Sequence, residues 1–180
     1  MYLYIIGFLI LIVIYELYKS HLRSIRRRVV YNKAVITAQN KHKKLLVIGD
    51  PDNGGHNMIF GRDYDCGDVC LDLVGCKNCE NSMKAKIEDA LPTFEDNSYV
   101  IFLSCVLEYI DKKSISFVLK ELKRVSGGDL FIVTVDPHTI TALFYPTRFL
   151  TGESSAKRLI KVEDMENVDI DKMDIKEFSN

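Results

Sequence analysis

The chain has 180 residues and a formal net charge of -1, with 24 lysines and arginines against 25 acidic residues. This length suits one ordinary domain with an appendage and excludes two full domains. The balanced charge and the 47% hydrophobic content give no sign of a protein that binds polyanions over its whole surface. The charges are nevertheless segregated, because residues 1–18 are almost wholly apolar, residues 19–44 are basic and the C-terminal end is acidic.

The segment from Tyr2 to Leu17 is apolar apart from Glu16 near its end. A helix of about 17 residues is roughly 25 Å long, which spans a thin bilayer. A cleaved signal peptide is the main alternative, but no basic residue precedes the run and no small-x-small cleavage site follows it. A buried core helix is the other alternative. We therefore predict one transmembrane helix over residues 1–18.

Basic residues follow this apolar run and none precedes it. Because positive charge stays on the inner side of a membrane, the pattern predicts a single-pass protein with its N-terminus outside and its folded domain in the cytoplasm. The basic segment, residues 19–42, is expected to contact anionic headgroups of the lipid bilayer. Nucleic acid is the less favoured partner for this segment.

Beyond residue 42 the pattern changes to short aliphatic runs that alternate with helical spacing. The runs predict four strands, at Leu45–Asp50, Asp68–Leu73, Ser98–Val106 and Asp129–Asp136. Helical spacing between the last two strands is shown by Ile115, Val118, Leu119, Leu122 and Val125. Strand, helix and strand joined by a short glycine exit form a parallel crossover unit. The predicted fold class is α/β, with a Rossmann-like, mostly parallel sheet in a domain that covers residues 43–165.

Three blocks of sequence stand in a characteristic order: VIGDPDNGG after the first strand, KIEDALPTFEDNSYVIFLSCVLEYID around the third, and VLKELKRVSGGDLFIVTVDP through the helix to the fourth. In this order the chain resembles the class I S-adenosylmethionine-dependent methyltransferases, over roughly Lys43 to Pro137. The resemblance implies a trimmed version of that fold. It also implies transfer of a methyl group from S-adenosylmethionine to an acceptor that the sequence does not name.

The resemblance further implies where the cofactor would lie. The loop after the first strand would cradle it, the acidic Asp72 would bind the ribose hydroxyls, and the residues after the third strand would line the place of methyl transfer. The implied cofactor-binding residues are Gly49, Asp50, Gly54, Gly55, Asp72, Ser104 and Cys105. No catalytic residue is assigned, because methyl transfer needs mainly alignment of the reacting atoms.

Two departures from the family pattern suggest an alternative. The loop has the run from Asp50 to Asn53 where the family has small residues and glycine, and Lys86 stands where the family has an acidic residue near the adenine. The alternative is a catalytically inactive scaffold that uses the same fold to hold a protein partner. An anchor on a trimmed domain of this kind also resembles short proteins of large double-stranded DNA viruses, which implies a virion or membrane component.

Four of the five cysteines cluster in the run CGDVCLDLVGCKNC, at Cys66, Cys70, Cys76 and Cys79. A reducing cytoplasm disfavours disulfides, so free or buried thiols are expected. A zinc site built from these four residues is the weaker alternative, since two residues between Cys76 and Cys79 let both thiolates reach one ion. The acidic tail, residues 166–180, is expected either to pair with the basic segment or to be disordered.

Overall fold

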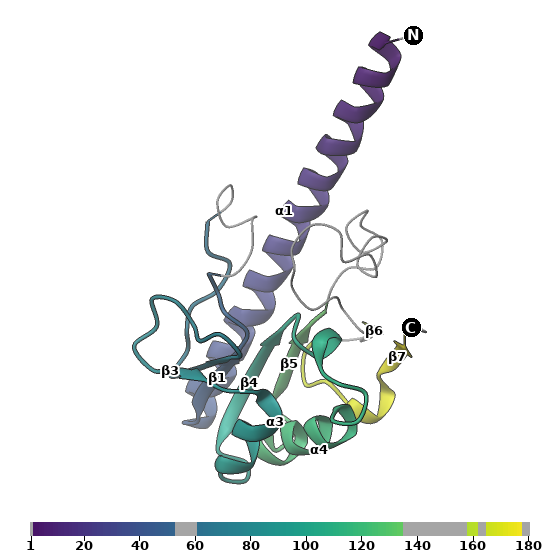
Figure 1. Cartoon of the computed structure of the whole chain (residues 1–180). Coiled ribbons are helices and arrows are strands. Elements are labelled where there is room, and N and C mark those ends of the chain that lie inside the picture. Colours follow the sequence, from purple (N-terminus) through teal and green to yellow (C-terminus); the bar gives the residue numbers. More distant parts are fainter. Residues whose placement is uncertain (1, 53–60, 135–157, 162–164, 178–180) are drawn as a thin grey trace.

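A long N-terminal helix lies against one face of a five-stranded sheet in the computed structural model of the chain (Figure 1). The structure describes residues 2–52, 61–134, 158–161 and 165–177. The helix, α1 (Tyr2–Lys41), has 40 residues and leads almost directly into the first strand. Shorter helices cover the opposite face, so the sheet is the middle layer of three.

All strands of the sheet are parallel and follow the order β3-β2-β1-β4-β5. Their bounds are β1 Lys44–Ile48, β2 Val69–Asp72, β3 Ser82–Lys84, β4 Tyr99–Ser104 and β5 Leu130–Val133. The central strands β1, β4 and β5 are almost wholly buried, as continuous aliphatic runs require when both faces are covered. The predicted α/β class and the four predicted strands are confirmed. The short edge strand β3 was not predicted.

The C-terminal half of α1 packs on the sheet through Val30, Tyr31, Ala34 and Ala38, which lie on one side of the helix. Tyr31 meets the ring of Phe102 in β4 edge to face, with 5.3 Å between ring centroids. Aromatic pairs in this geometry stabilise a contact beyond the apolar area they bury. This face therefore fixes the C-terminal half of α1 as part of the domain core.

The predicted transmembrane helix is wrong. Among the residues that the structure describes, none of the helices combines the length and apolar character that crossing a membrane requires. The helix does not end at residue 18 as a separate anchor but continues without a break into the part that packs on the sheet. Within this helix, Glu16 and Lys19 interrupt the apolar run. The predicted single-pass topology, with an outer N-terminus and a cytoplasmic domain, was derived from that transmembrane helix and is therefore not supported either.

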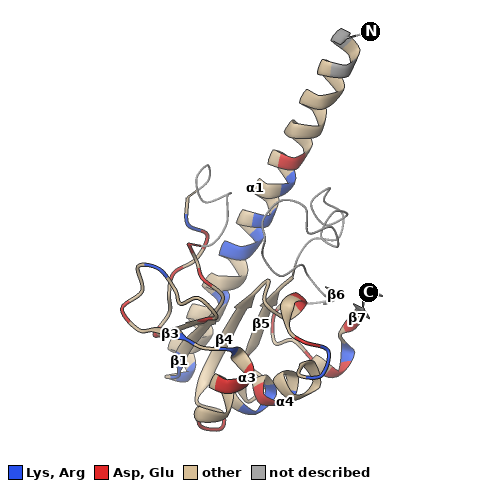
Figure 2. Cartoon of the chain, in the orientation of Figure 1, with Lys and Arg blue, Asp and Glu red and all other residues tan. Residues whose placement is uncertain are grey.

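Basic residues gather along the middle of α1, as Figure 2 shows. Several of them bind carboxylates of the domain: Arg27 pairs with Asp63, Lys33 with Glu166, and Lys41 with Asp129. The basic segment thus forms ion pairs between α1 and three other parts of the chain.

The second face of the sheet is covered by α3 (Ile87–Ala90), the 3-10 turns η1 (Leu91–Thr93) and η2 (Leu107–Tyr109), and α4 (Ile115–Ser126). Helix α4 is the predicted amphipathic helix, and the five apolar positions named from its spacing are buried. It ends at Gly127, which adopts the left-handed conformation at φ 61°. That conformation is the usual reason for glycine at a helix C-terminus.

The C-terminal segment adds a two-stranded antiparallel sheet, β6 (Arg158–Lys161) with β7 (Asp174–Glu177), beside the 3-10 turn η3 (Ile170–Lys172). Backbone hydrogen bonds join this segment to β5, from Ile132 N to Met165 O at 3.1 Å and from Val168 N to Leu130 O at 2.8 Å. Of the two expectations for the acidic tail, pairing with the basic segment is supported by the Lys33–Glu166 contact.

Candidate functional site at the carboxyl edge of the sheet

The order of the strands reverses between β1 and β4, because β2 and β3 continue to one side and β5 to the other. In open parallel sheets, ligands bind beyond the carboxyl ends of the strands at such a point. Gly49 and Asp50 follow β1 here, and Ser104 and Cys105 end β4. The structure therefore brings together four of the residues that the sequence predicted for a cofactor site.

Gly49 lies in close contact with the end of β4. Its φ is 108°, and a Cβ atom at this position would be 2.9 Å from the carbonyl oxygen of Ser104. Only glycine fits both the backbone conformation and the space. The backbone after β1 thus lies close to the end of β4 at the switch point.

Two carboxylates are held next to each other by backbone amides. Asp72, at the end of β2, accepts from the N–H of Asp50 at 3.1 Å and from the N–H of Val74 at 2.9 Å. Asp50 is 5% exposed, and its Oδ1 accepts from the N–H groups of Asp52 at 3.0 Å and Lys77 at 3.3 Å. A carboxylate has about four acceptor sites. Asp72 is partly exposed and retains capacity to bind a hydroxyl group.

Arg27 of α1 reaches the same edge from the helical layer. Its guanidinium places Nη2 at 3.6 Å from Sγ of Cys105 and donates from Nη1 to Oδ2 of Asp63 at 3.1 Å. Asp63 is buried and also accepts from the hydroxyl of Ser24. Tyr64, the next residue, directs its hydroxyl toward the carbonyl oxygen of Asp50 at 3.4 Å.

Sequence reasoning missed Arg27, Asp63 and Tyr64. Arg27 was assigned to a lipid-facing segment, but it precedes Tyr31 by four residues and Ala34 by seven, and such spacing puts a residue on the same side of a helix. That spacing was the signal that could have placed Arg27 toward the sheet. Asp63 and Tyr64 lie in a loop without periodicity, so no comparable signal exists for them.

Three groups around Arg27 have shifted pKa values, and burial is the largest cause in each. Burial by itself would lower the pKa of Arg27, but the nearby groups Cys105, Tyr64 and Asp63 raise it above its ordinary value. Burial raises the pKa of the Cys105 thiol, and Arg27 offsets this only in part. Burial likewise raises the pKa of Tyr64. Cys105 is therefore a thiol rather than a thiolate near neutral pH, which argues against its use as a nucleophile.

Other predicted residues lie elsewhere. Gly54 and Gly55 fall outside the described residues. Lys86 is exposed and lies at the N-terminal boundary of α3. Cys105, by contrast, lies at the candidate site. Its φ is positive, at 53°, which is uncommon for a residue with a side chain and often marks a functional position.

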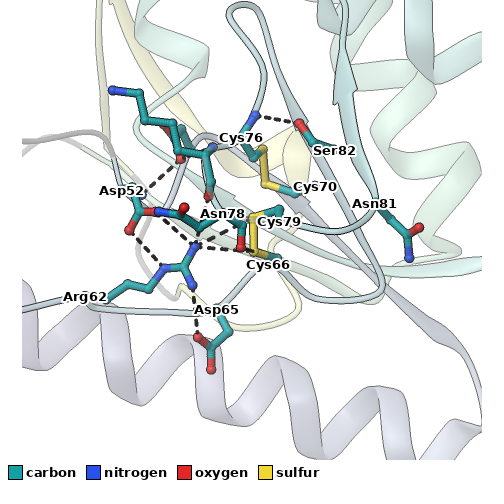
Figure 3. Close-up of a disulfide and its surroundings, with 12 residues drawn as sticks. Asp52, Arg62, Asp65, Cys66, Cys70, Cys76, Asn78, Cys79, Asn81 and Ser82 are labelled. Carbon is teal, nitrogen blue, oxygen red and sulfur yellow. Dashed lines mark hydrogen bonds and ion pairs between the residues drawn. A yellow bond between two sulfur atoms is a disulfide. The ribbon is translucent and has the colours of Figure 1, made fainter.

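The expectation of free thiols in the cysteine cluster is wrong. Two disulfides join Cys66 to Cys79 and Cys70 to Cys76, with Cα–Cα distances of 5.6 Å and 6.1 Å (Figure 3). Both distances fall in the usual range for disulfides. The expectation failed because it was derived from the cytoplasmic topology, and not from the positions of the residues. Cys105 remains a free cysteine.

Comparison with known protein families, with curated proteins and with solved structures finds no match to this chain. The strand order and the residues at the carboxyl edge are therefore the observations that bear on function.

Proposed function

We propose that the chain is a methyltransferase-like protein that binds S-adenosylmethionine at the carboxyl edge of its sheet and transfers the methyl group to an acceptor. The observation that carries the proposal is the β3-β2-β1-β4-β5 order of parallel strands, which sets Gly49 beside Asp72 and Ser104 at three neighbouring strand ends. A nucleoside is bound in this arrangement by a glycine after the first strand and a carboxylate after the second.

Asp72 supports the proposal by its position and its free acceptor capacity. It follows Asp50 by 22 residues and is joined to it by the 3.1 Å hydrogen bond, so its carboxylate lies beside the loop after β1. Two ribose hydroxyls would donate to this carboxylate in charge-assisted bonds. The adjacent ends of β1 and β4 would align the methyl group with an acceptor, and alignment alone supplies much of the rate of such a transfer.

Titration calorimetry of the full chain with S-adenosylmethionine tests this proposal. We expect saturable heat, together with a rise in the unfolding temperature that grows with cofactor concentration. Asp72→Asn should weaken binding at least about tenfold, since a charge-assisted bond to the ribose becomes a neutral one. Asp89→Asn, the same change at an exposed position of α3, should bind like the unchanged chain. No heat and no stabilisation at millimolar cofactor overturns the proposal.

A non-catalytic scaffold is the second candidate, and one observation favours it. The carboxylates of Asp50 and Asp52 lie in the loop after β1, where the carboxylate of a bound cofactor would meet like charge. Arg62 neutralises Asp52 in part, with 3.1 Å between Nε and Oδ1. A folded chain that fails to bind the cofactor in the same titration would favour this second candidate.

A further inference from the structure

The sulfur atoms of four cysteines gather beside β2 (Figure 3): Cys66 precedes this strand, Cys70 lies in it, and Cys76 and Cys79 follow it. The Sγ atoms of Cys70, Cys76 and Cys79 all lie within 4.8 Å of one another, although they belong to two different disulfides. Cys66 joins the group through its bond to Cys79. Four thiolates around a tetrahedral zinc ion, at about 2.3 Å from it, are roughly 3.8 Å apart. The sulfurs of Cys70, Cys76 and Cys79 are therefore spaced close to the size of one zinc site, and Cys66 is the fourth cysteine, bonded to one of them.

The spacing along the chain also suits zinc. Three residues separate Cys66 from Cys70, and two separate Cys76 from Cys79. Both spacings are typical of the paired ligands in structural zinc sites. The second pair lies in a tight turn in which Asn78 has a φ of 55° and the N–H of Cys76 donates to Oγ of Ser82 at 2.7 Å. The turn is thus already shaped to direct two sulfurs toward one point.

A cation faces the cluster. Nη2 of Arg62 lies 3.3 Å from Sγ of Cys66 and 3.7 Å from Sγ of Cys79. Disulfide sulfurs are neutral and accept hydrogen bonds weakly, whereas a zinc ion with four thiolates carries a net charge of about -2. Asp52 and Asp65 orient the same guanidinium, at 3.1 Å and 3.5 Å. Residues that hydrogen-bond to metal ligands orient those ligands and tune the affinity for the metal.

We propose that Cys66, Cys70, Cys76 and Cys79 form a tetrahedral Zn²⁺ site when they are reduced. Each disulfide takes two electrons and two protons from a dithiol reductant, which leaves as its own cyclic disulfide. Zinc then displaces four protons from the four thiols and binds the four thiolates. The cluster thereby exists in two states, a two-disulfide state and a zinc-thiolate state.

Either state would fix the turn that contacts the candidate site. In that turn, the N–H of Lys77 donates to Oδ1 of Asp50 at 3.3 Å, and Nδ2 of Asn78 donates to Oδ2 of Asp52 at 2.9 Å. The zinc site would hold these contacts in reducing surroundings, as the disulfides hold them in oxidising surroundings. This inference does not depend on cofactor binding.

Metal uptake by the full chain tests the proposal. The chain is fully reduced with a phosphine under argon, supplied with Zn²⁺, and analysed for zinc after removal of unbound metal. We expect about one zinc per chain, and in the Co²⁺ form the visible absorption of tetrahedral thiolate coordination. The disulfide form, carried through the same steps without reductant, should take up none. Cys105→Ser is the matched control and should bind zinc like the unchanged chain.

Variants of the ligands and of Arg62 sharpen the test. Cys76→Ser should weaken zinc binding by at least about tenfold because a thiolate ligand is lost. Arg62→Gln should keep the stoichiometry but weaken binding by about tenfold. If Cys76→Ser fails to fold, the comparison of zinc uptake by the reduced and disulfide forms still tests the proposal. A reduced, folded chain that binds no zinc overturns the proposal, as does an octahedral cobalt spectrum or equal uptake by the disulfide form.

Discussion

The guanidinium of Arg27 donates to the carboxylate of Asp63 across 3.1 Å, and this bond joins α1 to the loop that leads into β2. The side chain of Asp63 is 0% exposed and that of Arg27 is 15% exposed. Loss of Arg27 would leave the buried Asp63 carboxylate with the Ser24 hydroxyl and the more distant Arg28, at 3.9 Å, and a buried charge that loses its nearest partner is costly. The ion pair therefore ties the long helix to the candidate site.

Arg27→Leu should lower the free energy of unfolding by about 3 kcal/mol, because it leaves the Asp63 carboxylate buried without this guanidinium. Urea unfolding followed by circular dichroism measures the loss. Arg26→Leu makes the same change at the neighbouring, exposed position and should alter stability by less than about 0.5 kcal/mol. Equal losses in the two variants would show that the Arg27–Asp63 pair does not stabilise the fold.

Gly49→Ala should destabilise the chain more than Gly128→Ala does. Both glycines have positive φ, 108° and 95°, so both variants incur backbone strain of about 1–2 kcal/mol. Only at Gly49 would the new Cβ also meet the Ser104 carbonyl oxygen, at 2.9 Å, whereas nothing lies within 4 Å of it at Gly128. We expect Gly49→Ala to cost at least about 1 kcal/mol more in thermal or urea unfolding. A smaller cost at Gly49 than at Gly128 would contradict the close approach of β1 and β4.

Asp129 should make stability depend on pH in the acid range. Burial raises its pKa, but hydrogen bonds and charge from Lys41 and Lys43 outweigh burial and hold the pKa below its ordinary value. A carboxyl group whose pKa is lower in the folded chain stabilises it above the unfolded pKa of about 3.9, and this contribution is lost as the pH falls through the folded pKa.

We therefore expect Asp129→Asn to be less stable than the unchanged chain at pH 6, with a difference that narrows below about pH 4. Urea unfolding at a series of pH values measures this. Asp89→Asn, the same change at an exposed position of α3, is measured in parallel as the control. A constant difference between Asp129→Asn and the unchanged chain at all pH values would rule out the predicted linkage.

Much of the sheet could be predicted because its strands are continuous apolar runs. The run from Leu45 to Asp50 contains all but the first residue of β1, and Ser98–Val106 contains β4 whole. The edge strand β3 could not be predicted, since Ser82, Met83 and Lys84 show neither an apolar run nor an alternation long enough to stand out. The error on α1 has a different cause. An apolar segment can have the same composition whether it spans a membrane or forms the first part of a helix that later packs on the core.

The candidate site was predictable in part, for reasons of topology. Gly49, Asp72 and Ser104 follow strands, and parallel strands end at one edge, so their proximity could be expected. Arg27 arrives from a helix that precedes the sheet, and only long-range packing places it there. The pairing of the cysteines could not be predicted, because four cysteines allow three pairings and the sequence does not choose among them.

The two disulfides give a last prediction about stability in the oxidised chain. Their loops differ in length, with sequence separations of 13 for Cys66–Cys79 and 6 for Cys70–Cys76. A crosslink stabilises chiefly by restricting the unfolded chain, and the longer loop restricts it more. Changing both Cys66 and Cys79 to alanine should therefore lower the free energy of unfolding by about 3 kcal/mol. Changing both Cys70 and Cys76 should lower it by about 2 kcal/mol through loop closure alone.

Urea unfolding without reductant measures both losses. Alkylation of the denatured, unreduced chain is the control, and it should label Cys105 alone, because the other four sulfurs are bonded in pairs. Peptide masses then identify the pairs. Labelling of more than one cysteine, or pairing of Cys66 with Cys70, would contradict the connectivity. Cys70 lies in β2 and is buried, so its change to alanine also leaves a small cavity. The measured loss of unfolding free energy should therefore exceed the loss expected from loop closure.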